Sequence, residues 1–480
     1  MDSEKKDNSG NMGDSGNTSR RDFIRLAAAT GLTIGASRKS SGESRTYLTP
    51  RDYESQPKRI SPSDKIRLAT IGIGGQGSSD TGVALRVPGV ELVAVADVYD
   101  GRLARAKEVW GDKVFTTRDY REVLARPDVD AVIVATPDHW HAQIASDAIK
   151  AGKDVYCEKP MVQLIGDGAG VIDVWKKSDR IFQVGSQRVS SIVYQKAKEL
   201  LASGVIGELN LIEAWFNRRS PISAWQYSIP PDASPQTVDW DRFLGRAPKK
   251  PFEPIRLFRW RNYRDYGTGI GGDLFVHLFS GIHYVVGTNG PSRVMATGGL
   301  RYWNDGRDVP DVLLGLYDYP KSNKYPAFNI ALRVNFADGS VEPTSFESSG
   351  FRFVGSDAVI TIGNGVTVSR KQRPKEPGYT INTFPKALQD QFLKEYREKY
   401  PEDRKQTVLS GEESYLPPPG YSDSFDHFTN FFNAVRSRTP ITEDPVFGFR
   451  AAGPALLTNQ SYFENRAYGW NPDTMRITGE

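Results

Sequence analysis

Cysteine is almost absent from this chain, and its scarcity excludes two kinds of chemistry. Among 480 residues there is one cysteine, Cys157, so neither an intramolecular disulfide nor a cysteine-based zinc cluster can form. No apolar run reaches the roughly 18 residues that a membrane-spanning helix needs. Basic blocks are missing as well, since 62 Lys and Arg face 58 Asp and Glu, a net charge of +4 spread along the chain. We therefore expect no nucleic-acid partner and no polybasic membrane surface.

The rest of the composition is that of a globular protein. Apolar residues make up 38% of the chain, charged residues 25% and aromatic residues 11%, which excludes wholesale disorder. The length fits two large domains better than three small ones. Histidine is rare, and the five histidines are His139, His141, His277, His283 and His427. Only the pair at 139 and 141 has close ligand spacing, so we expect no metal site.

The first 64 residues have the pattern of a targeting signal followed by a linker. Arg20 and Arg21 precede Phe23 and a short apolar run that ends at Ala36. Paired arginines before such a run are typical of a twin-arginine export signal. We expect a signal region over residues 1–37, a linker over 38–64, and an exported protein. The protein is then periplasmic, or anchored to the membrane if the signal stays uncleaved; no other membrane span is expected.

A dinucleotide-binding motif opens the folded part of the chain. Residues 65–71 predict a strand, and Gly-Ile-Gly-Gly-Gln-Gly follows at 72–77, which matches G-x-G-x-x-G. The first glycine permits a tight turn, the second lets a pyrophosphate approach, and the third lets helix and strand pack closely. A helical segment over 83–87 and a strand over 90–96 come next. The motif predicts these cofactor-binding residues: Gly72, Ile73, Gly74, Gly75, Gln76 and Gly77.

Asp97 ends the second predicted strand, 20 residues past Gly77, where an acidic residue binds the ribose 2′-hydroxyl. A carboxylate repels the 2′-phosphate of NADP, so Asp97 favours NAD. Arg102 and Arg105 follow closely and weaken that preference. We therefore expect NAD as the cofactor, with NADP less favoured.

Strand and helix patterns continue to alternate, which predicts a doubly wound parallel sheet. Residues 131–135 form an all-apolar strand, as a sheet covered on both faces requires, and 154–157 predict the next one. Ligands of such sheets bind beyond the carboxyl ends of the strands. The residues expected there are Thr136, Pro137, Glu158 and Lys159, together with His141 near the nicotinamide. A purely structural role for His139 or His141 stays open.

Three motifs at this spacing resemble the Gfo/Idh/MocA oxidoreductase family: Thr-Pro-Asp-His-Trp-His at 136–141, Ala-Gly-Lys at 151–153 and Glu-Lys-Pro at 158–160. The resemblance implies an α/β protein in two parts. A Rossmann dinucleotide-binding domain would span 65–185, and an α+β domain with a large, mostly antiparallel open sheet would span 186–480. The resemblance also implies a homo-oligomer, either a dimer or a tetramer, with contacts made by the open sheet.

A second glycine-rich run opens a predicted helix that carries Asp273 and His277. Their i, i+4 spacing puts both on one helical face and matches the family's D-x-x-x-H motif. The resemblance implies that His277 is the acid/base with Asp273 beside it, and that Lys159 completes the catalytic set. As structural alternatives, Asp273 could be a helix N-cap and His277 a buried core histidine.

Oxidation of a secondary alcohol releases a hydride, which NAD accepts, and a proton, which needs a base. Imidazole suits this task because its ordinary pKa of about 6.5 lies near working pH. We rank His277 first as the base. Lys159 would then stabilise the substrate oxygen, or serve as the base itself if burial favours its neutral form.

Four residues are candidates for substrate binding. Gln187 and Arg188 end a strand-like run, and Trp260 and Tyr263 lie in an aromatic, arginine-rich stretch over 258–264. Aromatic faces and bidentate donors suit stacking on, and hydrogen bonding to, a carbohydrate. An ordinary structured loop is the alternative for the stretch over 258–264.

The sequence thus predicts an exported NAD(P)-dependent oxidoreductase that acts on a secondary hydroxyl of a sugar or polyol. Two alternatives remain. One is an NAD-dependent glycoside hydrolase or lyase that oxidises its sugar transiently, as in glycoside hydrolase family 109. The other is a non-catalytic sensor of NAD or sugar. The resemblance implies that the hydrolases lack lysine in the Glu-Lys-Pro position, so Lys159 favours net oxidoreduction.

Overall fold

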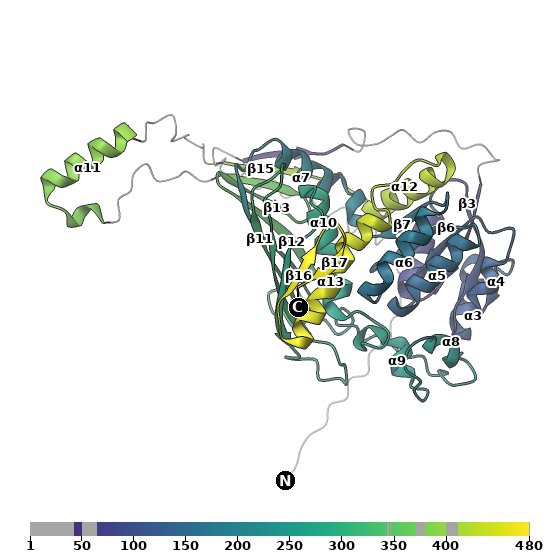
Figure 1. Ribbon diagram of the computed structural model, residues 1–480. Helices are drawn as coiled ribbons and strands as arrows, with labels where there is room; N and C mark the ends of the chain where they lie inside the picture. The colour runs from purple at the N-terminus through teal and green to yellow at the C-terminus, as the bar shows by residue number, and fades with distance from the viewer. Residues whose placement is uncertain are drawn as a thin grey trace, which may run out of the picture. The chain divides into compact units, whose positions relative to one another are not determined.

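The segment in which strands and helices were predicted to alternate forms a six-stranded parallel sheet with connecting helices (Figure 1). We analysed a computed structural model that describes residues 43–49, 65–342, 345, 347–370, 380–399 and 411–479. The strand order is β4-β3-β2-β5-β6-β7. Strand β2, which leads into the glycine motif, lies in the middle, as in the doubly wound dinucleotide-binding fold. The bounds are β2 Ile66–Ile71, β3 Val90–Ala96, β4 Phe115–Thr117, β5 Ala131–Val134, β6 Asp154–Glu158 and β7 Phe182–Gly185.

Five helices connect these strands. They are α2 Gly75–Ala84, α3 Asp100–Trp110, α4 Tyr120–Leu124, α5 Asp138–Lys150 and α6 Ile165–Lys176. The sequence places the first helix too late, over 83–87, whereas α2 begins at Gly75 inside the glycine motif and ends at Ala84. All four residues of β5 are buried, which fits a central strand covered on both faces.

The second sheet has eleven described strands and is mostly antiparallel. Its order is β1-β15-β14-β13-β12-β8-β11-β10-β9-β16-β17, and the two parallel pairs among these strands are β1 with β15 and β8 with β11. The bounds are β1 Glu43–Tyr47, β8 Leu209–Asn217, β9 Arg293–Gly299, β10 Val312–Tyr319, β11 Phe328–Asn335, β12 Ser348–Gly355, β13 Ala358–Ile362, β14 Val366–Arg370, β15 Gly411–Leu416, β16 Tyr468–Asn471 and β17 Arg476–Thr478. The fold class predicted from the sequence is confirmed: an α/β protein with a Rossmann sheet and a second, large and mostly antiparallel open sheet.

One face of the large sheet packs against helices α7 Ile192–Ala202, α10 Val276–Val286 and α13 Pro445–Glu464 (Figure 1). The opposite face keeps apolar side chains exposed, among them Met295, Leu314 and Leu316. Side chains alternate between the two faces along each strand. In β10, for example, Leu313 is buried while Leu314 is 44% exposed.

One part of the large sheet differs from the sequence-based expectation. Residues 43–47, expected in the linker, form β1, which pairs in parallel with β15. The sequence of β1 is polar and has no strand pattern. It forms a strand because its backbone hydrogen-bonds to the edge of β15, which is far away in the chain.

Helix α12, Asp423–Ser437, belongs to the C-terminal part of the chain but covers the small parallel sheet. Its aromatic residues Phe428, Phe431 and Phe432 pack with apolar residues of β2, β5 and β6. The Phe428 ring stacks on Tyr156 of β6 with 4.4 Å between ring centroids. The helical spacing of these phenylalanines predicts a core-facing helix, and this prediction is confirmed.

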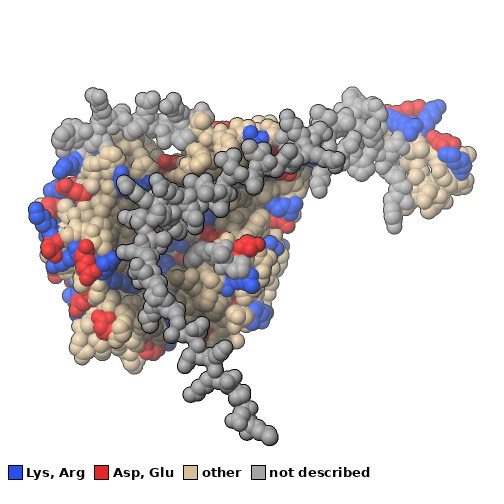
Figure 2. Space-filling model, turned by 180° about the vertical axis from the view of Figure 1, so that it is seen from behind, with Lys and Arg blue, Asp and Glu red and all other residues tan. Residues whose placement is uncertain are grey.

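The surface charge is mixed. Figure 2 shows basic and acidic groups interspersed over one face of the molecule. In the part of the chain that the structure describes, no helix has the length and apolar character to cross a membrane. The same residues contain no group of three or more His, Cys, Asp or Glu side chains placed to hold a metal ion.

Candidate functional site

The glycine motif forms the turn between β2 and α2, at the carboxyl edge of the parallel sheet. Gly72 has φ +87°, and a Cβ there would lie 2.7 Å from the backbone of Ala135 and Thr136. A Cβ on Gly77 would lie 2.0 Å from the carbonyl oxygen of Gly72. Only glycine fits both positions, since helix α2 packs directly against the turn.

A cavity of about 460 Å³ runs along this turn, within the usual size of a small-molecule site. Seven predicted cofactor residues line it: Gly72, Gly74, Gly75, Gln76, Asp97, Thr136 and Pro137. Ile73 and Gly77 belong to the same turn but lie behind its surface, where both are buried. Backbone N–H groups at the start of α2 suit a pyrophosphate, so these residues fit a dinucleotide.

Asp97 is held in place at this cavity by its neighbours. One carboxylate oxygen accepts from the backbone N–H of Ile73 at 3.0 Å and the other accepts from that of Tyr99 at 3.1 Å. Arg102 approaches the first oxygen at 3.4 Å and also lines the cavity. Arg105 instead pairs with Glu108 on the surface, so of these two arginines only Arg102 lies at the ribose end.

We expect Asp97→Ser to reduce the preference for NAD over NADP by about 10²-fold, because the 2′-phosphate would meet Arg102 without a repelling carboxylate. The ratio of the two dissociation constants is the measurement, since damage to the turn would weaken both cofactors alike. Arg105→Ser is the control and should leave the ratio unchanged. An unchanged ratio in Asp97→Ser would mean that Asp97 does not bind the ribose.

The opposite wall of the cavity comes from residues 225–263, which we call the strap. It contains the short helices α8 Trp240–Leu244 and α9 Pro254–Phe258 (Figure 1). Backbone hydrogen bonds join it to the turn between β3 and α3: the N–H of Asp239 donates to Val98 at 2.8 Å, and that of Asp100 donates to Thr237 at 2.9 Å. The strap residues that line the cavity are Tyr227, Ser228, Arg242, Phe243, Leu257, Phe258, Trp260 and Arg261.

The two neighbouring histidines both have structural roles. The ring nitrogens of His141 lie 2.8 Å from the carbonyl oxygens of Thr136 and Pro160. His141 therefore ties the turns after β5 and β6 together and does not line the cavity, contrary to the prediction. His139 lies 2.8 Å from the carbonyl oxygen of Phe243 in the strap, and burial lowers its pKa to about 4.

Glu158, which is buried, and Gln187, which is half-buried, form a hydrogen-bonded pair. The amide of Gln187 donates to Glu158 at 2.7 Å and to the Tyr156 hydroxyl at 2.9 Å. Both amide hydrogens are thus engaged, and Glu158 is only 4% exposed. Burial raises the pKa of Glu158, and the charge of Lys159 offsets part of that rise. The substrate role of Gln187 and the cofactor role of Glu158 therefore stay predictions, with each side chain already a partner of the other.

Lys159 and Asp273 meet although they are far apart in the chain. Lys159 Nζ donates to Asp273 Oδ1 at 3.0 Å and to its carbonyl oxygen at 3.1 Å. Arg261 Nε donates to the same Oδ1 at 3.4 Å. Burial favours the neutral acid, but the charges of Lys159 and Arg261 outweigh it and hold the pKa of Asp273 below its usual range.

His277 lies near this pair but is not held by Asp273. Gly271–Phe275 is a π-helical turn that precedes α10, and its wider i→i+5 geometry does not stack side chains at i and i+4 as an α-helix does. The His277 ring instead stacks on Phe216, with centroids 5.8 Å apart. The expected contact between Asp273 and His277 is therefore replaced by the contact between Asp273 and Lys159.

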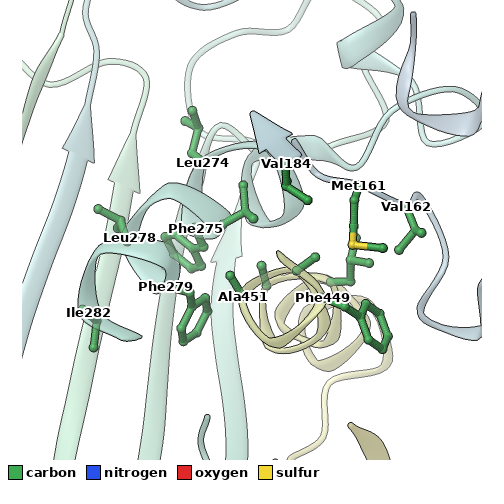
Figure 3. Packing of buried hydrophobic residues seen from close by; sticks show 14 of the residues in the cluster. Met161, Val162, Val184, Leu274, Phe275, Leu278, Phe279, Ile282, Phe449 and Ala451 are labelled. Atoms are coloured by element: carbon green, nitrogen blue, oxygen red, sulfur yellow. The ribbon is translucent and has the colours of Figure 1, made fainter. Parts of the chain in front are cut away.

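The turn that carries these residues is firmly anchored. Figure 3 shows Phe275 and Phe279 beside Ala451 of α13, and Leu274 belongs to the same buried cluster. Phe275 and Phe279 are fully buried. A rigid apolar support fixes the positions of Asp273 and His277, as a preorganised site requires.

The electrostatics favour a neutral imidazole. Burial lowers the pKa of His277 well below its ordinary value, and the charges of Lys159 and Arg188 lower it further. Asp273 offsets only part of that effect. The unprotonated ring, the form that accepts a proton, is thus the form present near neutral pH.

Arg188 lies close to the site, as predicted, and a second arginine, Arg218, shares its partner Glu347. The guanidinium of Arg188 donates to Glu347 and Ser349, each at 2.8 Å, and Arg218 contacts the other Glu347 oxygen at 3.4 Å. Both guanidinium groups lie over the Phe216 ring, at 5.5 and 5.2 Å. Sequence analysis missed Arg218; its place just after β8, at the end of a strand, was the available signal.

Of the two aromatic candidates, only Trp260 reaches the cavity. Tyr263 is 6% exposed and packs in the apolar cluster of the strap, with Arg256 over its ring at 4.5 Å. The substrate role expected for Tyr263 is not supported. Arg261, between them in the same stretch, is the residue that touches both the cavity and Asp273.

Asp138 was also missed. Its carboxylate accepts from the backbone N–H and the hydroxyl of Thr268, at 2.9 and 2.7 Å, which joins α5 to the turn before Asp273. Burial and the nearby charge of Asp273 raise the pKa of Asp138 to about 7. Its position directly after Thr136-Pro137 was the available sequence signal.

Two family models match the chain. Residues 66–186 match the NAD-binding Rossmann fold of the oxidoreductase family, and residues 195–297 match its C-terminal alpha/beta domain. These two segments belong to the Gfo/Idh/MocA oxidoreductase family. The resemblance inferred from the motifs at 136–141 and 158–160 is thus confirmed, and the cavity beside the glycine motif lies in an NAD-binding domain.

Curated relatives match part of the chain. A glycosyl hydrolase family 109 protein of Shewanella baltica is 30% identical over 208 residues, 40% of this chain and 44% of the relative. An inositol 2-dehydrogenase of Rubrobacter xylanophilus is 33% identical over 155 residues, 32% of this chain and 44% of the relative. The match therefore spans less than half the length of either relative.

Solved structures share the fold more completely. Levoglucosan dehydrogenase in complex with NADH and levoglucosan has a TM-score of 0.58 and 17% identity, covering 84% of this chain and 98% of that one. The scyllo-inositol dehydrogenase of Lactobacillus casei, with bound NAD(H) and scyllo-inositol, has a TM-score of 0.55 and 18% identity over the same shares, 84% and 98%. At these identities the comparison establishes the fold alone.

Proposed function

We propose that the protein is an exported NAD-dependent oxidoreductase that transfers a hydride between a secondary hydroxyl of a sugar or polyol and the nicotinamide. One observation carries this proposal: a neutral His277 lies near the ion pair of Lys159 and Asp273, and Arg261 connects that pair to the cofactor cavity. Inositol and levoglucosan dehydrogenases among the similar proteins support it.

When bound, NAD supplies the hydride acceptor, and the chain's own residues handle the proton and the charge. His277 accepts the hydroxyl proton because its ring is unprotonated. Lys159, held by Asp273, donates to the substrate oxygen and stabilises negative charge there as the carbonyl forms. Asp97 and the Gly72–Gly77 turn hold the cofactor, and the strap excludes water from one side of it.

The test is the formation of NADH by the purified protein with a panel of sugars, polyols and their aryl glycosides. Net NADH supports the proposal. Aglycone release without net NADH would instead support the transient-oxidation hydrolase, which the family 109 relative keeps as a second candidate. Tight NAD and sugar binding with neither product would favour a sensor.

Export rests on Arg20 and Arg21, which lie outside the described residues. We expect the double change Arg20→Lys with Arg21→Lys to abolish export and to leave active protein in the cytoplasm, because twin-arginine signals are read by a receptor. Cell fractionation measures this, with Arg25→Lys as the matched control. Continued export of the double variant would remove the assignment.

We also propose a homo-oligomer, a dimer or a tetramer, formed through the outer face of the large sheet. Leu314 and Leu316 are 44% and 52% exposed there, next to Met295, and large exposed apolar groups favour association. We expect Leu316→Arg to reduce the mass measured by light scattering to that of a smaller species. Leu388→Arg, on helix α11 Lys386–Lys399, is the control for a charge added at another exposed leucine. If Leu316→Arg leaves the mass unchanged, the interface lies elsewhere.

A further inference from the structure

Positive side chains outnumber ionised carboxylates around His277, and the proposed function does not use the surplus. Asp273 is shared by Lys159 and Arg261. Glu347 is likewise shared by Arg188 and Arg218. Each carboxylate therefore faces two cations.

The other nearby carboxyl groups are Asp423, which acts on Arg188, and Asp138 and Glu158, whose burial disfavours the charged form. Burial raises the pKa of Asp138 to about 7 and also raises the pKa of Glu158. Both groups thus bind protons more readily than an exposed acid does. The oxidised nicotinamide ring carries a further positive charge, so the excess is largest in the state that oxidises a substrate.

The two further cations share an aromatic neighbour with His277. Arg188 and Arg218 both lie over Phe216, the ring on which His277 stacks. The side chain of Arg218 is 8% exposed and that of Arg188 is 35% exposed. Arg188 is therefore partly exposed, while Arg218 is largely desolvated.

A neutral polyol would leave this charge uncompensated in a site of low dielectric, which is costly. A carboxylate would compensate it, and guanidinium groups bind planar carboxylates through paired hydrogen bonds. We propose that the substrate is an acidic sugar, of the uronic or aldonic acid class. Arg188 and Arg218 bind its carboxylate, and its reacting hydroxyl lies at Lys159 and His277. This inference rests on the proposed function and narrows its substrate.

The test compares matched pairs with the full-length, NAD-loaded protein: D-glucuronate with D-glucose, and D-gluconate with sorbitol. We expect the acid of each pair to bind more tightly by roughly 10-fold to 100-fold, the size of a hydrogen-bonded charge contact. Added salt should weaken the binding of the acid and leave the binding of the neutral sugar unchanged, because screening acts on charge pairs. Calorimetry measures binding, and NADH formation is followed separately.

Arg188→Gln tests the residue. We expect it to raise KM for the acid by roughly 10-fold to 100-fold with a much smaller change in kcat, and to reduce the salt dependence. Arg352→Gln is the control, since Arg352 pairs with Glu213 on the outer sheet face and should leave both constants unchanged. Thermal unfolding checks that Arg188→Gln remains folded.

The outcomes separate the inference from the function. If neutral sugars reduce NAD and acids bind no better, the inference is overturned and the function stands. If acids bind better but no sugar or acid reduces NAD, the function is overturned and the acidic ligand stands. Glucose 6-phosphate binding more tightly than glucuronate would overturn the carboxylate assignment. If Arg188→Gln changes KM for the acid and for the neutral sugar equally, Arg188 does not bind the carboxylate.

Discussion

We expect His277→Ala to lower turnover by roughly 10²–10⁴-fold, the usual contribution of an acid/base group, while NAD binding is retained. The ring is neutral and lies near Lys159, whereas the cofactor cavity is lined by other residues. Steady-state NADH formation and NAD titration measure the two effects separately. Near wild-type turnover in this variant would show that the base lies elsewhere, with Lys159 the next candidate.

The pH profile gives a second signature of the same residue. Because burial and nearby cations lower the pKa of His277, activity in the wild type should decline only below the ordinary histidine range, as the ring becomes protonated. That acidic limb should vanish in His277→Ala. In Lys159→Met the limb should move to higher pH, because the loss of one positive charge raises the pKa of His277. A limb at the same pH in all three proteins would contradict the assignment.

Lys159→Met should also slow turnover, by removing the charge that stabilises the substrate oxygen. Since both residues act on one oxygen, the losses should not add in the double variant. Lys249→Met, an exposed lysine paired with Asp241, is the control and should behave as wild type. Fully additive losses would mean that the two residues act at different steps.

The second large effect is expected at Gly77. A methyl group there would lie 2.0 Å from the carbonyl oxygen of Gly72, so the turn must move away from the cofactor. We expect Gly77→Ala to weaken NAD binding by about 10²-fold and to destabilise the fold by roughly 1–3 kcal/mol, the cost of overpacking. NAD titration and thermal unfolding measure the two losses.

Gly82 provides a matched control on the same helix. It lies within α2, Gly75–Ala84, and a Cβ there meets nothing within 4 Å. We expect Gly82→Ala to leave NAD binding unchanged and to stabilise the protein by roughly 0.5–1 kcal/mol, because glycine is unfavourable inside a helix. If Gly77→Ala behaves like Gly82→Ala, the tight packing of the turn does not govern cofactor binding.

Local patterns in the sequence predicted the parallel sheet, the glycine turn and the wall of the cavity that this turn and the strand ends form. These features depend on residues close in the chain: Gly72 to Gly77 share one turn, and Asp97 ends the next strand. They also depend on strand ends, since parallel strands bring Thr136 and Lys159 to one edge. Periodicity alone likewise predicted α12 as a core-facing helix.

Only the tertiary structure decided which partners these residues have. Asp273 faces Lys159, 114 residues away in the chain, and not His277, because a π-helical turn replaces the regular helix that the spacing assumed. Arg218, Arg261 and Asp138 join the site through contacts between distant segments. Spacing along one element has no information about such contacts, which depend on how separate elements pack. The sequence identified His277 as the candidate base and Lys159 as the candidate cation. Their protonation depends on burial and on neighbouring charges, so only the packing decided that the His277 ring is neutral and that Asp273 is ionised.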